Sequence, residues 1–171
     1  MTPPLDAAAI ERRPVPPLGG FGPSIVRLEV RRLLRNRRTV IFTMVVPTIF
    51  FLIFGLNASY GTHPVGSGNE SAAILISMAV YGAVLATTTG GAMVSIERAA
   101  GWSRQLRITP LSPAAYVVAK MLTSLVLAAA AVGVVYMVGS ATGKPHMPVS
   151  VWVLTALLVW VGSLLFAAFG L

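Results

Sequence analysis

The chain has 171 residues, of which 56% are hydrophobic and only 11% are charged, and its mean hydropathy is +0.80. Soluble domains carry about 25% charged residues, so the composition excludes a water-soluble protein and indicates an integral membrane protein. The net charge is +8, but the basic residues flank apolar runs, where anionic lipid explains them and nucleic acid need not be invoked. The absence of cysteine excludes disulfide and thiol chemistry.

Residues 1–23 hold half of the prolines together with three glycines, which predicts a disordered cytoplasmic tail. A helix should follow from Ile25, capped by Ser24. Its apolar stripe holds Val26, Val30, Leu33 and Leu34, and its basic stripe holds Arg27, Arg31, Arg35 and Arg38. Such an amphipathic helix should lie in the inner membrane interface. The simpler alternative is a basic flank that only fixes topology.

Four apolar runs follow, at about residues 39–57, 72–96, 114–138 and 150–171. Each has about the 20 residues that a helix needs to cross the hydrocarbon. Backbone groups must be satisfied internally in lipid, so these runs should be helices. The expected fold is therefore an all-α integral membrane protein with an interfacial helix and four transmembrane helices. Ser112 and Pro113 should cap and begin the third span.

Several residues inside the spans predict how the helices pack. Pro47 should kink the first span, because proline removes a backbone hydrogen bond. Gly82, Ala86 and Gly90 recur every four residues in the second span, and small residues in this pattern let helix backbones approach closely. Lys120 lies about 10 Å into the third span. We expect it to snorkel to the cytoplasmic headgroups; a role at a partner-facing cleft is the alternative.

The arginines predict the orientation of the chain. Eight arginines precede Thr39 and three lie in residues 97–113, whereas the two other loops together hold one basic residue, Lys144. The positive-inside rule then places both termini and residues 97–113 in the cytoplasm, with residues 58–71 and 139–149 outside. No polar or basic anchor follows the fourth run, so we expect the chain to be cut short.

The sequence shows no catalytic or metal-binding constellation. None of the five carboxylates lies deep in an apolar run, which disfavours an ion-driven secondary transporter. His63 and His146 lie in separate outer loops without a Glu or Cys partner at metal spacing. We therefore expect no metal site, and a membrane-embedded enzyme is disfavoured.

Residues 97–113 are the one charged segment between two long apolar runs. Trp102 and Leu106 are spaced as neighbours on a helix, and Pro110 should stop that helix. A connection that only turned the chain would need just a few residues, so this segment indicates a surface for a partner. An interfacial loop with basic flanks is the alternative.

The segment resembles the motif of type-2 ABC exporter permeases. The matching residues are Glu97-Arg98, Gly101, Leu106 and Thr109-Pro110-Leu111-Ser112. The motif falls between the second and third spans, as that family requires. The likeness to daunorubicin-resistance members extends into Pro113–Tyr116 and Lys120, and more weakly to Pro47 with Phe54-Gly55. It covers about residues 24–171, although family members have six spans and this chain offers four.

The resemblance implies an exporter-type transmembrane domain at residues 24–171, with a coupling helix that docks on a separate ATP-binding subunit. The residues implied at this ATPase-coupling interface are Glu97, Arg98, Gly101, Trp102, Arg104, Leu106, Arg107, Thr109, Pro110 and Leu111. ATP and Mg²⁺ would belong to that partner, and this chain would carry no cofactor.

The other implied partners are a second permease copy or homologue and the lipid bilayer of a plasma (bacterial inner) membrane. The cargo would be a hydrophobic drug, a lipid-like molecule or a glycan, exported from the cytoplasm. A different class of function stays open. The small-residue faces would also suit a non-transporting membrane anchor or assembly protein that binds other helices.

Overall fold

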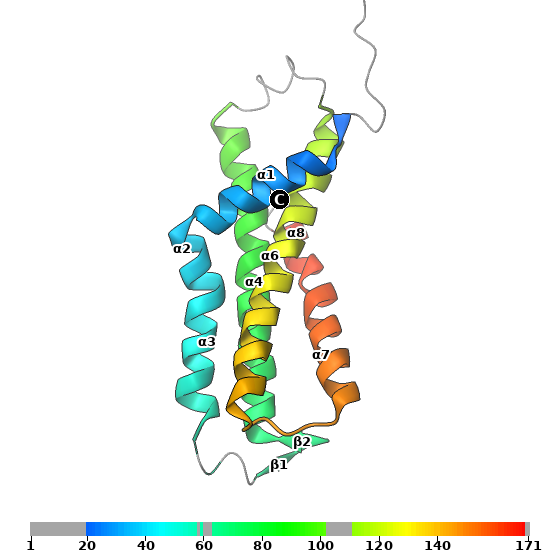
Figure 1. The fold of residues 1–171 in the computed structure, drawn as a ribbon. Helices are drawn as coiled ribbons and strands as arrows, with labels where there is room; N and C mark the ends of the chain where they lie inside the picture. The colour runs from blue at the N-terminus through cyan, green and yellow to red at the C-terminus, as the bar shows by residue number, and fades with distance from the viewer. Residues whose placement is uncertain (1–19, 58, 60–62, 102–110, 170–171) are drawn as a thin grey trace, which may run out of the picture.

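The computed structural model describes residues 20–57, 59, 63–101 and 111–169. Within these residues the chain forms four helical segments long and apolar enough to cross a membrane, and an N-terminal helix lies across one end of them (Figure 1). The segments are Arg37–Gly55, Glu70–Ala99, Pro113–Thr142 and Val149–Phe169. The predicted all-helical membrane fold is thereby confirmed. The second and third helices extend beyond their apolar runs at both ends.

The N-terminal helix α1 (Pro23–Arg35) meets the first span at a corner made by Asn36. The predicted cap by Ser24 is wrong: Gly22 is the N-cap residue, and no side chain caps this helix. A proline fits the first helical position, because the N–H group that it lacks would have no partner there. The Asn36 side chain accepts hydrogen bonds from two backbone N–H groups and so begins α2 (Arg37–Val40). This corner turns the chain from across the bundle to along it (Figure 1).

The first span is a helix of mixed pitch. After α2 come the π-helical turn η3 (Ile41–Val45), the helix α3 (Val46–Phe50) and a second π-helical turn, η4 (Phe51–Gly55). Pro47, in α3, cannot donate a hydrogen bond to the Thr43 carbonyl, its acceptor in a regular α-helix. Wider turns therefore lie on both sides of this buried proline.

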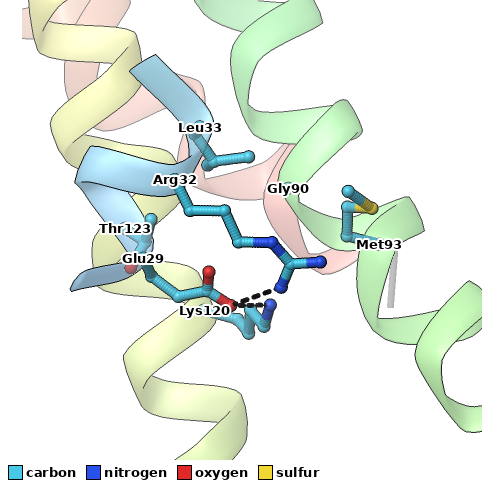
Figure 2. A pocket seen from close by; sticks show the side chains of 7 residues that line it. All are labelled: Glu29, Arg32, Leu33, Gly90, Met93, Lys120 and Thr123. Carbon is cyan, nitrogen blue, oxygen red and sulfur yellow. Dashed lines mark hydrogen bonds and ion pairs between the residues drawn. The ribbon is translucent and has the colours of Figure 1, made fainter. Parts of the chain in front are cut away.

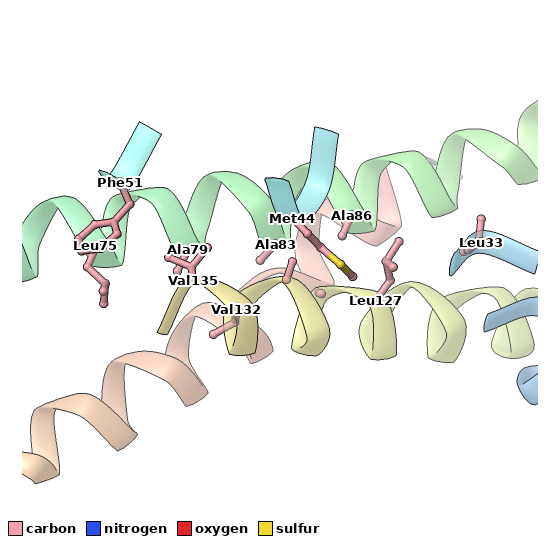
Figure 3. Close-up of a cluster of buried hydrophobic side chains, with 12 residues drawn as sticks. Leu33, Met44, Phe51, Leu75, Ala79, Ala83, Ala86, Leu127, Val132 and Val135 are labelled. Carbon is pink, nitrogen blue, oxygen red and sulfur yellow. The ribbon is translucent and has the colours of Figure 1, made fainter. Parts of the chain in front are cut away.

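The helices α4 (Glu70–Ala99) and α6 (Pro113–Thr142) form the central pair of the bundle, and their buried faces make the core (Figure 3). The small and apolar residues of α4 recur every three or four positions, which places them on one side of the helix. Those of α4 are Leu75, Ala79, Ala83 and Ala86, and those of α6 are Leu127, Ala128, Ala131, Val132 and Val135. Met44 and Phe51 extend the core to the first span.

The start of α6 follows the sequence prediction. Ser112 Oγ accepts a hydrogen bond of 3.2 Å from the Ala115 N–H, and Pro113 occupies the first turn. The cap therefore satisfies one of the N–H groups that a helix start leaves without an intrahelical partner. At the other end, Gly143 adopts a left-handed φ of 62°, a conformation that favours glycine at a helix C-terminus.

The fourth span consists of α7 (Val149–Gly162) and α8 (Leu164–Phe169). No residue of α7 is buried, and α7 is joined to α6 by polar side chains. Trp160 Nε1 donates a 2.9 Å hydrogen bond to the Leu125 carbonyl, and the Tyr136 hydroxyl donates one of 2.9 Å to Thr155 Oγ1. These bonds satisfy polar groups within an apolar span, where an unpaired one would be costly.

A short hairpin connects the first span to α4 at the end of the bundle opposite α1 (Figure 1). Its strands β1 (Pro64–Val65) and β2 (Gly68–Asn69) are antiparallel, with Pro64 opposite Asn69. Asn69 also caps α4, because its Oδ1 accepts from the Ala72 N–H at 3.0 Å. The hairpin thus leads directly into the second span.

Candidate functional site

The residues implied at an ATPase-coupling interface fall into two groups in the structure. Glu97 and Arg98 lie in the last turn of α4, Gly101 follows with a positive φ of 79°, and Leu111 lies just before α6. The others lie outside the described residues; they are Trp102, Arg104, Leu106, Arg107, Thr109 and Pro110. The structure therefore shows the two ends of the segment, where α4 ends and α6 begins.

The Glu97 carboxylate bridges from α4 to α6. The Tyr116 hydroxyl donates a hydrogen bond to Oε2, and Lys120 Nζ lies 3.0 Å from Oε1. The Glu97 side chain is only 14% exposed. A residue that resemblance places at a contact with another protein thus forms contacts within the chain.

Lys120 is the shared cation of two carboxylates from different helices. It forms an ion pair with Glu29 of α1 as well as with Glu97 of α4. Its ammonium group also lies 5.6 Å from the ring centre of Tyr116, a favourable cation–π distance. The residue is 8% exposed. The prediction that Lys120 snorkels to the headgroups is therefore wrong, since its charge is balanced inside the bundle.

Arg32 completes this group from the outer face of α1. Its guanidinium nitrogen lies 3.2 Å from Glu97 Oε1 and 3.6 Å from Glu29 Oε1. The Arg32 side chain is 60% exposed, in contrast to the two carboxylates. We call Glu29, Arg32, Glu97, Tyr116 and Lys120 the charged junction. Its two cations balance its two anions, as a group of largely buried charges requires.

A small cavity of about 10 Å³ lies beside the charged junction (Figure 2). Its walls come from α1, α4 and α6, and the residues are Glu29, Arg32, Leu33, Gly90, Met93, Lys120 and Thr123. This volume holds about one water molecule, and polar side chains are available to bind it. No group of three metal-ligating side chains occurs among the described residues. The site thus holds three helices together and has room for about one water molecule.

The small residues of α4 lie against neighbouring helices. A Cβ atom at Gly90 would lie 2.5 Å from the Cβ of Ser124 in α6, and one at Gly82 would lie 2.8 Å from the Thr43 carbonyl. Ala86, between them, is fully buried. This face of α4 therefore packs on α6 and on the first span at distances that larger side chains would not allow.

Glu29 is one residue of the junction that sequence reasoning missed, and Arg32 is another. A signal was present, because Glu29 follows Val26 by three positions and precedes Leu33 by four. These positions place an acidic residue on the apolar side of the helix. A carboxylate there requires a buried cation, and Lys120 is the cation that lies within the four apolar runs, although we expected it at the headgroups.

Comparison with known proteins assigns the chain to a class. A model of the ABC-2 type transporter family matches residues 24–171, so the chain belongs to that family. It is a multi-pass membrane protein, and its four candidate membrane spans lie within the matched region. Permease domains of this family lack ATPase activity and work with ATP-binding subunits.

A curated relative comes from Bacillus subtilis (strain 168), where it is named "Putative transport permease YvfS". The two proteins are 28% identical over 144 residues, which cover 83% of this chain and 58% of that protein. The chain thus spans little more than half the length of this relative. No solved structure matches.

Proposed function

We propose that the chain is the membrane permease subunit of an ATP-driven exporter, and that residues 97–111 contact a separate ATP-binding subunit. One observation carries the proposal: the charged junction joins the end of α4, the start of α6 and α1. A displacement of the segment between α4 and α6 would therefore act on three helices together. Family membership and the motif in this segment support the same function.

The proposed cargo is a hydrophobic drug, a lipid-like molecule or a glycan, moved out of the cytoplasm. The proposed setting is a plasma (bacterial inner) membrane, with a second permease copy or homologue beside this one. ATP and Mg²⁺ would bind the ATPase partner. Support for this cargo range comes from the resemblance to drug-export permeases and from spans that carry few polar side chains.

The proposed topology places the N-terminus and residues 97–111 in the cytoplasm and the hairpin outside. Because the chain has no natural cysteine, single introduced cysteines report on one position each. A membrane-impermeant maleimide added outside should label Gly66→Cys and spare Arg104→Cys until the membrane is opened. Labelling of intact cells at position 104 rather than at 66 would reverse the topology.

The contact with the ATPase is tested by Leu106→Asp in the full-length protein. A charge buried without a partner in a protein contact typically costs several kcal/mol. ATPase association in a pull-down and transport-coupled hydrolysis should fall together, while membrane insertion stays normal. Ser67→Asp is the matched control, because it adds the same charge to an exposed position at the opposite end of the bundle.

Full ATPase association and export by the Leu106→Asp protein would show that residues 97–111 are not the coupling contact. A non-transporting anchor or assembly protein would then be the better description. That role predicts other membrane proteins, and no ATPase, among the proteins that co-purify.

A further inference from the structure

We propose that Glu97, Tyr116, Lys120 and Glu29 hold the end of α4 and the start of α6 at a fixed separation. We call these four residues the neck clamp, and we call the place where α4 ends beside the start of α6 the neck. Glu97 is the first residue of the proposed 97–111 contact segment, and within this neck clamp it is a positioning residue and not itself a contact to the ATPase. The inference rests on the proposed function, because it concerns how the coupling segment is held. It differs from what the motif alone implies, in which the acidic-basic pair belongs to the contact surface.

The first argument is the position of the hydrogen bond between Tyr116 and Glu97. Glu97 lies two residues before the end of α4, and Tyr116 is the fourth residue of α6. Their hydrogen bond joins residues that are 19 positions apart in the chain. It fixes the end of one helix to the start of the next, the two helices that the motif segment connects in sequence. The two ends of the segment thus keep a fixed separation.

The second argument is that both carboxylate oxygens of Glu97 are already used. Oε2 accepts from the Tyr116 hydroxyl, while Oε1 faces both Lys120 at 3.0 Å and Arg32 at 3.2 Å. Three of the roughly four acceptor sites of the carboxylate are thus used within the chain, two of them by charged groups, whose bonds are among the strongest in proteins. Arg98, the next residue, is exposed and suits a contact surface better.

The third argument is the connection to α1. Lys120 binds Glu29 of α1 (Figure 2) and at the same time Glu97, so α1 is attached to the point where α4 and α6 are joined. Leu33 of α1 is buried one turn further along and holds the helix there. A movement of the neck should therefore carry α1 with it, and this requires that Lys120 keep both partners.

Spin labels test the clamp directly. Ala99 and Ala114 are exposed on the two sides of the neck, so Ala99→Cys and Ala114→Cys accept nitroxide labels in the full-length protein. Electron paramagnetic resonance then gives the distribution of the distance between them in lipid bilayers. We expect Tyr116→Phe and Lys120→Met to broaden this distribution. A distribution as narrow as in the parent protein for both variants would overturn the clamp.

Tyr136→Phe is the matched control. It removes the same hydroxyl from the same helix, where that group donates to Thr155 and not to the neck. The label distribution should be unchanged in this variant. Equal broadening by Tyr136→Phe and Tyr116→Phe would contradict the clamp, because loss of any interhelical hydroxyl bond would then have the same effect.

Transport assays separate the clamp from the contact. Tyr116→Phe should leave ATPase binding within about twofold and lower transport per ATP hydrolysed by about tenfold, in line with the loss of a hydrogen bond to a charged group. Binding lost as in Leu106→Asp would make Tyr116 part of the contact and overturn the clamp. Transport equal to that of Tyr136→Phe would also overturn it. Failure of the proposed function looks different: the ATPase would then bind Leu106→Asp normally.

Discussion

The two ends of the bundle are held together by different chemistry. At the hairpin end, neutral side chains bond to backbone groups: Ser71 Oγ donates to the Gly55 carbonyl at 2.7 Å, and Asn69 Nδ2 donates to the Lys144 carbonyl at 2.8 Å. Asn69 Oδ1 in turn accepts from the His146 N–H at 3.0 Å. At the α1 end, the charged junction joins α1, α4 and α6 through side chains alone.

This difference shows which end a partner can influence. Hydrogen bonds to backbone carbonyls depend little on the charge of what approaches them. Ion pairs between side chains respond to nearby charges and weaken when one partner is lost. The end that carries the proposed ATPase contact is thus the end whose internal ties are electrostatic. Four substitutions sharpen this comparison, from the largest expected effect to the smallest.

The largest effect is expected from Lys120→Met. It leaves Glu29 and Glu97 with only the exposed Arg32 as a cation partner, and removing the buried partner of a buried charge typically costs about 3–5 kcal/mol. The free energy of unfolding in mixed micelles should fall by an amount of this order. Adding Glu29→Gln should restore part of the loss, because it removes one of the two carboxylates that have lost their buried cation.

If the change in unfolding free energy of the double variant equalled the sum of the two single changes, Lys120 and Glu29 would not act as partners. The effects of the two single substitutions should be strongly coupled, since both remove partners from one ion pair. The same pair of measurements therefore tests the junction without reference to transport.

Gly90→Leu should cause the next largest loss of stability. It changes the packing of α4 on α6, in the part of the bundle between its two ends. Even a Cβ atom at this position would lie 2.5 Å from Ser124. Overpacking of this kind typically costs about 1–3 kcal/mol. Gly133→Leu is the matched control, since no atom lies within 4 Å of a Cβ at that position. Equal thermal stability of the two variants would show that the α4–α6 contact yields to larger residues.

The sequence predicts the parts of this fold that depend on neighbouring residues. Hydropathy locates all four spans because each is one apolar run, and Ser112 with Pro113 marks the start of α6 because a helix cap involves residues three positions apart. Ser24 failed as a cap because a proline at the preceding position already began the helix.

The charged junction could not be assigned in the same way. Lys120 and Glu29 are 91 positions apart, so no periodicity within one helix connects them. Their pairing depends on how α1 crosses α4 and α6, which is a property of the folded bundle. The sequence does contain two residues that do not fit their surroundings. Lys120 is a cation within an apolar span, and Glu29 is an acid on the apolar side of the N-terminal helix. Two such residues at the same end of a bundle should be considered as partners.

Asn69→Ala should have a smaller effect, at the hairpin end. The variant loses the cap of α4 and the bonds to the 144–146 segment, with an expected cost of about 1–2 kcal/mol. Because these bonds are neutral, the loss should be the same at low and high salt. Asn57→Ala is the control, since Asn57 bonds locally to Ser59 at an exposed position. A strong salt dependence for Asn69→Ala would show that charge matters at both ends.

The smallest effect is expected from Arg32→Ala, although Arg32 contacts the same two carboxylates as Lys120. Its side chain is 60% exposed, so water and salt screen its ion pairs, and such surface pairs contribute about 0–1 kcal/mol. The loss of unfolding free energy caused by Arg32→Ala should be smaller still at about 1 M salt, because the Debye length there is about 3 Å. The effect of Lys120→Met should persist there, because its ammonium is buried. A loss from Arg32→Ala as large as that from Lys120→Met, and equally resistant to salt, would mean that the outer cation holds the junction. Burial would then not be what distinguishes these two ion pairs.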